Sequence, residues 1–112
     1  ILVGKNNLQN EQVSFKLSRR GDLWFHVKDI PGSHVLITGN ANPSDETITF
    51  AGELAAYFSK ARYSNLVQVD VLDVKKLHKP TGTAPGFVTY DREKTIRVTP
   101  DESVIKSRKI GK

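Results

Sequence analysis

The chain has 112 residues, of which 38% are hydrophobic and 26% charged, and a formal net charge of +5 at pH 7; this composition is typical of one folded domain and not of a disordered segment. It contains no cysteine, which excludes disulfides, thiolate metal sites and cysteine nucleophiles. Because no apolar run reaches the roughly 18–20 residues of a membrane span and no signal-peptide pattern opens the chain, we expect no membrane insertion.

Three strands are predicted in the first half of the chain, over residues 13–18, 23–27 and 35–37. The first alternates apolar with polar residues, which is the pattern of a half-buried strand. In the second, Phe25 and Val27 fall on one face and Trp24 and His26 on the other, because side chains alternate along a strand. Pro31 lies in the turn before the third strand, where the missing backbone N–H breaks a ladder.

A helix is predicted over residues 45–63. Ser44 is a favourable N-cap, and Asp45 and Glu46 place negative charge at the positive end of the helix dipole. Apolar residues then recur at helical spacing, namely Ala51, Leu54, Ala55, Phe58 and Ala61. Gly52 and the alanines indicate that the helix backbone lies close to a sheet.

The second half of the chain returns to strands. Val67, Val69 and Val71 predict a strand after the helix, and residues 87–90 and 95–98 predict a hairpin. Residues 75–86, rich in Lys, Pro and Gly, predict a surface loop. The basic tail, residues 103–112, is expected to fray or to form a short helix.

Strands outnumber helices in this reading, which indicates an α+β fold. The predicted architecture is a two-layer sandwich, in which one long helix covers a mainly antiparallel or mixed sheet.

Positive charge is concentrated in the last third of the chain. Residues 75–112 contain ten Lys or Arg against four Asp or Glu, whereas residues 1–74 contain seven against eight. This asymmetry favours a polyanionic partner, such as nucleic acid or an anionic surface. A solvated basic face without a partner would give the same pattern.

Residues 22–35 contain the only Trp and two of the three His. The candidate RNA-binding residues of this segment are Trp24, His26, Lys28, Ser33 and His34. Aromatic rings stack on splayed RNA bases, while Lys and His contact phosphates and base edges. The alternative is that Trp24 belongs to the core and that His26 is a structural partner of Asp22 or of a backbone carbonyl.

Two further segments fit the same polyanionic partner. Both combine cations with amides, hydroxyls or backbone N–H groups, the usual donors to phosphate. Their candidate residues are Lys75, Lys76, His78 and Lys79 in the loop, and Lys5, Asn6 and Asn7 near the start of the chain.

Catalysis and metal binding are weaker alternatives. Ser33 and His26 are compatible with a nucleophile and its base across a hairpin, but no Gly-x-Ser-x-Gly elbow accompanies them. A metal site would require His26, His34 and His78 to converge from separate segments. We therefore expect no catalytic residue, no metal site and no cofactor.

The run Asp22-Leu23-Trp24-Phe25-His26-Val27-Lys28, followed by Pro31-Gly32-Ser33-His34-Val35, resembles the signature of the NFACT-R domain of the NFACT family. The same resemblance includes three further motifs: Gly4-Lys5-Asn6-Asn7, Ala55-Ala56-Tyr57-Phe58-Ser59, and the loop that ends in Pro85-Gly86. It spans about residues 3–98. Within the loop, Thr81 and Ala84 stand where further lysines are common in the family.

The resemblance implies a non-catalytic RNA-binding module over residues 1–100, followed by a basic tail over residues 101–112. Because the chain begins at Ile1 and lacks Met, we expect a piece of a larger multidomain protein, whose other domains are also partners. Family members are bacterial and eukaryotic ribosome-quality-control factors, which bind stalled large ribosomal subunits and promote C-terminal tailing of the nascent chain. The implied partners are therefore tRNA and large-subunit ribosomal RNA, and the implied location is cytoplasmic and ribosome-associated.

The resemblance also carries an alternative function. Streptococcal and staphylococcal members are described as fibronectin- or fibrinogen-binding surface proteins, which implies an adhesin module at the cell surface of a Gram-positive bacterium.

Overall fold

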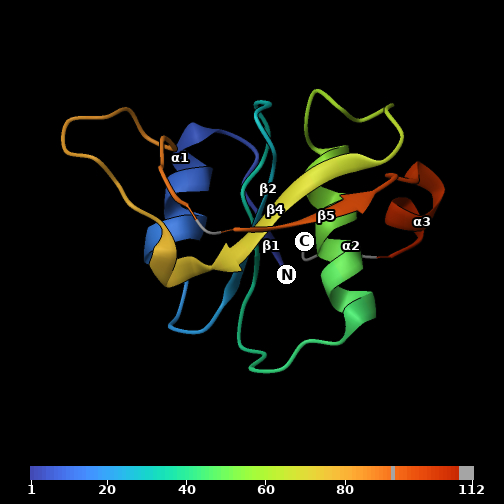
Figure 1. The fold of residues 1–112 in the computed structure, drawn as a ribbon, viewed down its shortest axis with the longest axis horizontal. Helices are drawn as coiled ribbons and strands as arrows, with labels where there is room; N and C mark the ends of the chain where they lie inside the picture. The colour runs from blue at the N-terminus through green and yellow to red at the C-terminus, as the bar shows by residue number, and fades with distance from the viewer. Residues whose placement is uncertain (92, 109–112) are drawn as a thin grey trace.

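The structure, a computed structural model, describes residues 1–91 and 93–108. A five-stranded sheet stands between α1 on one side and α2 on the other (Figure 1). The strands are β1 (Leu2–Val3), β2 (Leu23–Val27), β3 (Val35–Ile37), β4 (Val67–Asp73) and β5 (Lys94–Val98). The helical segments are α1 (Asn7–Glu11), the π-helical turn η1 (Gln12–Lys16), α2 (Asp45–Tyr57), the 3-10 turn η2 (Val74–Lys76) and α3 (Glu102–Ser107).

The strand order is β1-β3-β2-β4-β5, and every neighbouring pair is antiparallel. The predicted strands over residues 23–27, 35–37 and 67–71 are confirmed, as are the α+β class and the antiparallel sheet. In the register of β2 with β4, Leu23 pairs with Asp73 and Val27 with Val69. The sheet therefore has a Leu23 end, next to η2, and a Val27 end, next to the start of β4.

The helix α2 packs against one sheet face. Phe25 and Val27 of β2 meet Leu54 of α2 there, and none of the three is more than 1% exposed. As predicted, Ser44 caps this helix by accepting a hydrogen bond from the Thr47 backbone N–H at 3.2 Å. A Cβ at Gly52 would come within 2.7 Å of an Ile96 side-chain carbon. The predicted close approach of the helix backbone to the sheet is confirmed.

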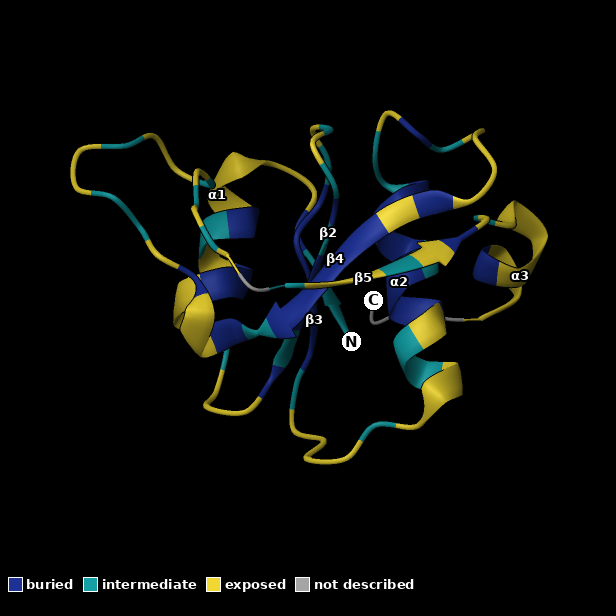
Figure 2. Cartoon of the chain, in the orientation of Figure 1, coloured by how far each residue is buried: buried dark blue, intermediate teal, exposed yellow. Residues whose placement is uncertain are grey.

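The opposite sheet face is covered as well. Trp24 and Leu36 form a second core there, together with Val13 of η1 and Leu77 after η2. Figure 2 shows buried residues on the inner side of α1 and exposed ones on its outer side. Several short helical segments therefore cover the sheet on both faces, and the prediction of a two-layer sandwich under one long helix is wrong.

The predicted extension of α2 to residue 63 is also wrong. The helix ends at Tyr57, where polar groups from the following segment donate hydrogen bonds to its last carbonyls. The Ser59 hydroxyl donates to the Ala56 carbonyl at 2.7 Å, and the Arg62 Nε donates to the Tyr57 carbonyl at 2.9 Å. The Ser33 backbone N–H donates a hydrogen bond to the Phe58 carbonyl at 3.0 Å. With its carbonyls occupied, the helix stops although apolar spacing continues to Ala61.

The predicted strand over residues 13–18 is helical in the structure. The Asn6 side chain caps α1 by accepting from the Gln9 backbone N–H at 2.8 Å, and η1 continues directly from α1. The alternating pattern was misleading because Phe15 and Leu17 are 37% and 50% exposed. They do not form the buried face of a strand.

The predicted hairpin over residues 87–98 is wrong in its first half. Residues 95–98 lie in β5, which pairs with β4. Residues 87–90 form no strand, because Thr89 instead exchanges both backbone hydrogen bonds with His78, at 2.8 and 2.9 Å. The predicted turn between them includes residue 92, which lies outside the described residues.

The predicted surface loop over residues 75–86 and the predicted short helix in the tail agree with the structure. Most residues of the 75–86 loop are at least partly exposed, and the tail contains the short helix α3, whose Ile105 is buried. Residues 109–112 of the predicted tail lie outside the described part. Within residues 1–91 and 93–108, no helix has the length and apolar character to span a membrane.

Candidate nucleic-acid interface

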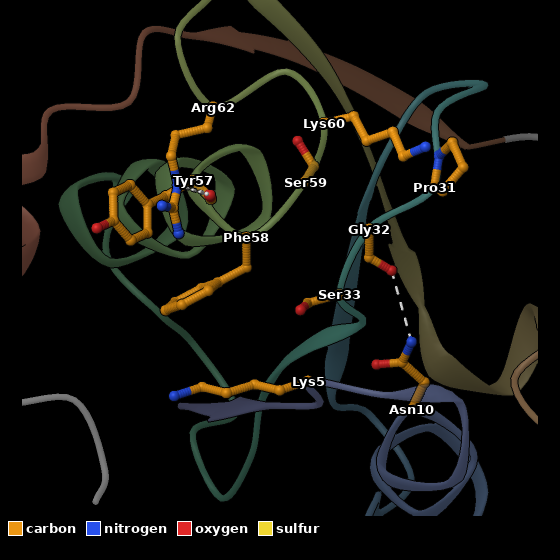
Figure 3. A pocket seen from close by; sticks show the side chains of 10 residues that line it. All are labelled: Lys5, Asn10, Pro31, Gly32, Ser33, Tyr57, Phe58, Ser59, Lys60 and Arg62. Atoms are coloured by element: carbon orange, nitrogen blue, oxygen red, sulfur yellow. Dashed lines mark hydrogen bonds between the residues drawn. The ribbon is translucent and has the colours of Figure 1, made fainter.

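An open cleft lies at the Val27 end of the sheet, between the loop after β2, the segment after α2 and the start of α1 (Figure 3). We call it the cationic cleft and define it by Lys5, Gly32, Ser33, Phe58, Lys60 and Arg62. It combines three positive side chains with a hydroxyl group, a partly exposed aromatic ring and the backbone of residues 31–33, which we call the glycine loop. These groups are the usual donors and stacking partners for RNA.

The cations of the cationic cleft keep their charge free for a ligand. The Lys5 ammonium lies 4.9 Å from the centroid of the Phe58 ring, and the Arg62 guanidinium lies 4.0 Å from the centroid of the Tyr57 ring. Among the described residues, neither these two cations nor Lys60 forms a salt bridge with a carboxylate. The aromatic contacts orient the cations without neutralising them.

Backbone contacts join two walls of the cationic cleft. Gly32 and Ser59 form an isolated bridge, and the Lys60 backbone N–H donates to the Pro31 carbonyl at 3.4 Å. A Cβ at Gly32 would lie 2.8 Å from the Ser59 Cβ. Only glycine fits this approach without a shift of the backbone, so the walls are held at a set separation.

Asn10 joins the third wall to the other two. This buried side chain accepts from the His34 backbone N–H at 3.0 Å and donates to the Gly32 carbonyl at 3.5 Å. The Gly4 backbone N–H donates to the His34 carbonyl at 2.9 Å, and a Cβ at Gly4 would come 2.3 Å from the Asn10 Oδ1. Asn10 thus places Lys5 beside the glycine loop.

A buried hydrogen-bond relay supports the glycine loop from beneath. The Trp24 Nε1 donates to the Ser14 hydroxyl at 2.8 Å, and this hydroxyl lies 2.7 Å from the His34 Nδ1. The Ser14 hydroxyl can donate to the His34 Nδ1 or accept from it, depending on the tautomer of the imidazole. Burial, the largest cause, lowers the pKa of His34 to about 3, and the neighbouring His26 lowers it further.

A second polar group lies beside the relay, on the same sheet face. The Lys28 ammonium contacts Asp70 at 2.9 Å and Glu93 at 3.0 Å, and the Tyr90 hydroxyl donates to Asp70 at 2.6 Å. The hydrogen bond to Asp70 is the largest of the effects that raise the pKa of Lys28. His26 pairs with Asp70 across the strands, and burial lowers its pKa against the opposing effect of that carboxylate.

Lys79 closes the basic loop onto α1. Its ammonium donates to the carbonyls of Ala84 and Phe87 and lies 3.2 Å from the Glu11 carboxylate. Glu11 also accepts from the Gly86 backbone N–H at 2.7 Å, and this hydrogen bond is the largest cause of its lowered pKa. The positive charge of Lys79 is therefore used within the protein.

Comparison with protein families places residues 1–85 in the NFACT protein RNA-binding domain. The chain belongs to this family.

The relatives agree with this assignment. The Rqc2 homolog RqcH of Streptococcus suis is 70% identical over 110 residues, which are 98% of this chain and 20% of that protein. The RqcH of Streptococcus pneumoniae serotype 2 is 65% identical over 109 residues, 97% of this chain and 20% of its own length. The RqcH of Bacillus subtilis is 52% identical over 110 residues, 97% of this chain and 19% of its own length. This NFACT domain therefore spans about one fifth of these curated relatives.

A solved structure shares the fold of this NFACT domain. It is the C-terminal part of the fibronectin/fibrinogen-binding protein from Streptococcus suis, with a TM-score of 0.95 and 70% sequence identity. The match covers 97% of this chain and 44% of the solved chain.

The NFACT fold brings together two of the segments predicted to bind RNA and part of the third. Asn10 and Gly4 connect residues 5–7 to residues 31–34, and Glu11 connects α1 to the loop that contains Lys79. Lys75 and Lys76 lie apart from this group, because η2 follows β4 at the Leu23 end of the sheet.

The individual side chains differ in access. Lys5, Asn6, Asn7, Lys75, Lys76 and His78 are exposed, and His26, Lys28 and Lys79 are half-buried. Trp24, Ser33 and His34 are 0%, 6% and 4% exposed. The stacking surface predicted on Trp24 is therefore absent from this NFACT domain, because the indole lies in the second core and donates to Ser14.

The catalytic and metal alternatives find no support in the geometry. The described hydrogen bonds join His34 to Ser14, and none joins Ser33 to His26. Within residues 1–91 and 93–108, no group of three or more His, Asp or Glu side chains is placed to hold a metal ion.

Sequence reasoning missed Phe58, Lys60, Arg62 and Asn10. The run Ser59-Lys60-Ala61-Arg62-Tyr63 does place two cations and an aromatic residue just after a helix, which is a recognisable signal. The helix predicted over residues 45–63 includes this run, and its cations were not among the predicted RNA-binding residues.

Proposed function

We propose that this chain is a non-catalytic RNA-binding module, which contacts tRNA or large-subunit ribosomal RNA through the cationic cleft. Its parent is a cytoplasmic, ribosome-associated quality-control factor, which binds stalled large subunits and promotes C-terminal tailing of nascent chains. The observation that carries the proposal is that three cations, none in a salt bridge among the described residues, line one cleft at the glycine loop of an NFACT RNA-binding domain. Its relatives in Streptococcus suis and Bacillus subtilis carry the name Rqc2 homolog RqcH, which supports this proposal.

The chemistry of the cationic cleft fits a sugar–phosphate chain with an accessible base. Lys5, Lys60 and Arg62 neutralise phosphates, and Arg62 adds a planar guanidinium that favours bidentate contacts. The ring of Phe58 is only partly covered and provides a surface for a splayed base. We propose Asn6, Asn7 and His78 as flanking contacts, since all three are exposed.

The remaining predicted residues have supporting roles in this proposal. Lys28 and Lys79 contact RNA only by exchanging a carboxylate for a phosphate, so each contributes less than a free cation. Trp24 and His34 support the glycine loop from beneath, and Ser33 fixes the loop to the segment after α2 through its backbone N–H. Lys75 and Lys76 are too far along the sheet to contribute to this cleft.

Fluorescence anisotropy with labelled tRNA at several salt concentrations tests the proposal. If four to six phosphates are engaged, log affinity falls against log salt with a slope of roughly −3 to −5. The variant Lys5→Ala/Lys60→Ala is expected to reduce the steepness of this slope by roughly 1.5 and to weaken binding at low salt at least ~10-fold.

The matched control is Lys94→Ala/Arg97→Ala, which removes two exposed cations from β5. It is expected to retain the slope of the wild type. Equal losses in the two variants would mean that only net charge matters, and that the cationic cleft is not the RNA site.

A second candidate function is binding of fibronectin or fibrinogen at the cell surface. The observation that favours it is the name of the S. suis protein whose C-terminal part shares this fold at 70% identity. The variant Lys5→Ala/Lys60→Ala separates the two functions. Loss of RNA binding with intact fibronectin binding would assign the cationic cleft to RNA, and the reverse result would favour the adhesin.

A further inference from the structure

We infer that this domain has a second RNA-contacting face at the Leu23 end of the sheet, so that it holds two RNA segments at once. The face is the open hollow around Phe15, Arg19, Arg20 and Lys75, and we call it the second basic face. It contains none of the residues of the cationic cleft. The face itself therefore does not depend on that cleft, but the count of two RNA segments rests on the function proposed for the cleft.

Two turns form the second basic face, and the fold joins them. Arg19 and Arg20 lie in the turn before β2, and Lys75 lies in η2 after β4. The Val74 backbone N–H donates to the Asp22 carbonyl at 2.9 Å, which ties the two turns together. Cations 55 positions apart in the chain thus line one hollow.

The carboxylates nearby do not neutralise these cations. Asp22 is 4% exposed and accepts from the backbone N–H groups of Arg19, at 2.8 Å, and Gly39, at 3.3 Å. Asp73 accepts from the Lys75 backbone N–H at 3.0 Å and so caps η2. Both acids serve the backbone of the turns, and the cationic side chains of the second basic face form no salt bridge within the described residues.

An exposed aromatic ring stands beside these cations. Phe15 is 37% exposed on the π-helical turn η1, where the Leu17 backbone N–H reaches the Gln12 carbonyl at 2.7 Å. A ring next to unpaired cations is the combination that binds single-stranded nucleic acid, since bases stack while phosphates are neutralised. An acidic protein surface would use the cations but would gain little from the ring.

The two cationic sites are too far apart for one strand of about three nucleotides, because successive nucleotides of a stacked strand are about 3.4 Å apart. The cationic cleft borders the Val27 end of β2 and the second basic face the Leu23 end, and this strand of five residues is roughly 15 Å long at about 3.3 Å per residue. Beside this strand, Lys79 and Lys28 have their charges engaged by carboxylates. Two separate RNA segments, or two parts of one folded RNA, fit this arrangement.

The test counts RNA strands per protein by native mass spectrometry, using the 112-residue chain and a single-stranded oligonucleotide of about three nucleotides, which is too short to reach both sites. The wild type is expected to bind two strands and Arg20→Ala/Lys75→Ala only one, with an unchanged melting temperature. The control Lys94→Ala/Arg97→Ala, with the same loss of charge, is expected to bind two. Phe15→Leu should weaken the second binding step at least ~5-fold, as expected for a lost base stack.

Several outcomes would overturn the inference: a wild type that binds one strand, an Arg20→Ala/Lys75→Ala variant that still binds two, or a control that also drops to one. Tighter binding of polyglutamate than of the oligonucleotide at this face would also overturn it, in favour of a protein partner. The Lys5→Ala/Lys60→Ala variant keeps the two proposals separate. If it still binds two strands while Arg20→Ala/Lys75→Ala binds one, the cationic cleft fails and the second basic face stands.

Discussion

Both faces of the sheet are buried, but they are built from different chemistry. On the α2 side the contacts are apolar, as between Phe25 and Leu54. On the α1 side a large aromatic residue, Trp24, is combined with buried hydrogen-bonding groups such as Ser14 and His34. Apolar contact is non-directional and supplies stability, whereas hydrogen bonds fix orientation. The α2 side therefore holds the domain together, and the α1 side positions the loops around the cationic cleft.

The largest effect on stability is expected on the α2 side of the sheet, where the contacts are apolar. Leu54→Ala removes a fully buried side chain and leaves a cavity, so the free energy of unfolding should fall by about 3 to 5 kcal/mol. Urea denaturation followed by Trp24 fluorescence measures this. Under native conditions the folded variant should bind RNA with the wild-type salt slope. A change in that slope would mean that the α2 side also positions the cationic cleft.

The next largest effect is expected on the α1 side of the sheet, which contains the buried polar groups and which we call the polar side. Ser14→Ala removes the partner of both the Trp24 Nε1 and the His34 Nδ1, so the free energy of unfolding should fall by about 2 to 3 kcal/mol. Unlike Leu54→Ala, it should also weaken RNA binding, because His34 and the glycine loop lose their support. Ser18→Ala, which removes a half-buried hydroxyl bonded to the Ser14 carbonyl, is the control. If Ser14→Ala changes stability alone, the relay has no role in positioning.

Acid should weaken the polar side selectively. The pKa of His34 is lowered to about 3 in the folded protein from its ordinary value of 6.5, so the unfolded chain binds the proton more readily between these values. This contribution to stability is intact above pH 6.5 and decreases as the pH falls, by about 2 kcal/mol at pH 5. Urea denaturation at pH 7 and pH 5 tests it. The decrease should be smaller in His34→Gln, and equal decreases would exclude His34 as its source.

The smallest expected effect concerns the edge of the polar side. Tyr90→Phe removes the hydroxyl that donates to Asp70 at 2.6 Å, while Lys28 still contacts the same carboxylate. Because Asp70 keeps a charged partner, the free energy of unfolding should fall by only about 1 kcal/mol. Thermal unfolding measures this difference. A loss as large as that of Ser14→Ala would place Tyr90 within the relay rather than at its edge.

Much of the fold could be predicted from local patterns. Residues 23–27, 35–37 and 67–71 are strands because their apolar content and alternation suit a sheet, and Ser44 begins α2 because its side chain satisfies a free N–H. The same alternation failed at residues 13–18, since it does not show whether the apolar residues are buried. The Trp-Phe-His and Pro-Gly-Ser-His motifs were sufficient to indicate the NFACT family.

The site depends on contacts that no local pattern contains. The family, the strands of the sheet and the excess of positive charge follow from the order of residues along the chain, because each is a property of neighbours or of composition. Tertiary structure decided that Trp24 is buried, that Lys79 and Lys28 pair with acids, and that Lys60 and Arg62 line the same cleft as Lys5. The free charges on the surface depend on which acids the fold brings near each cation, and that is set by long-range packing.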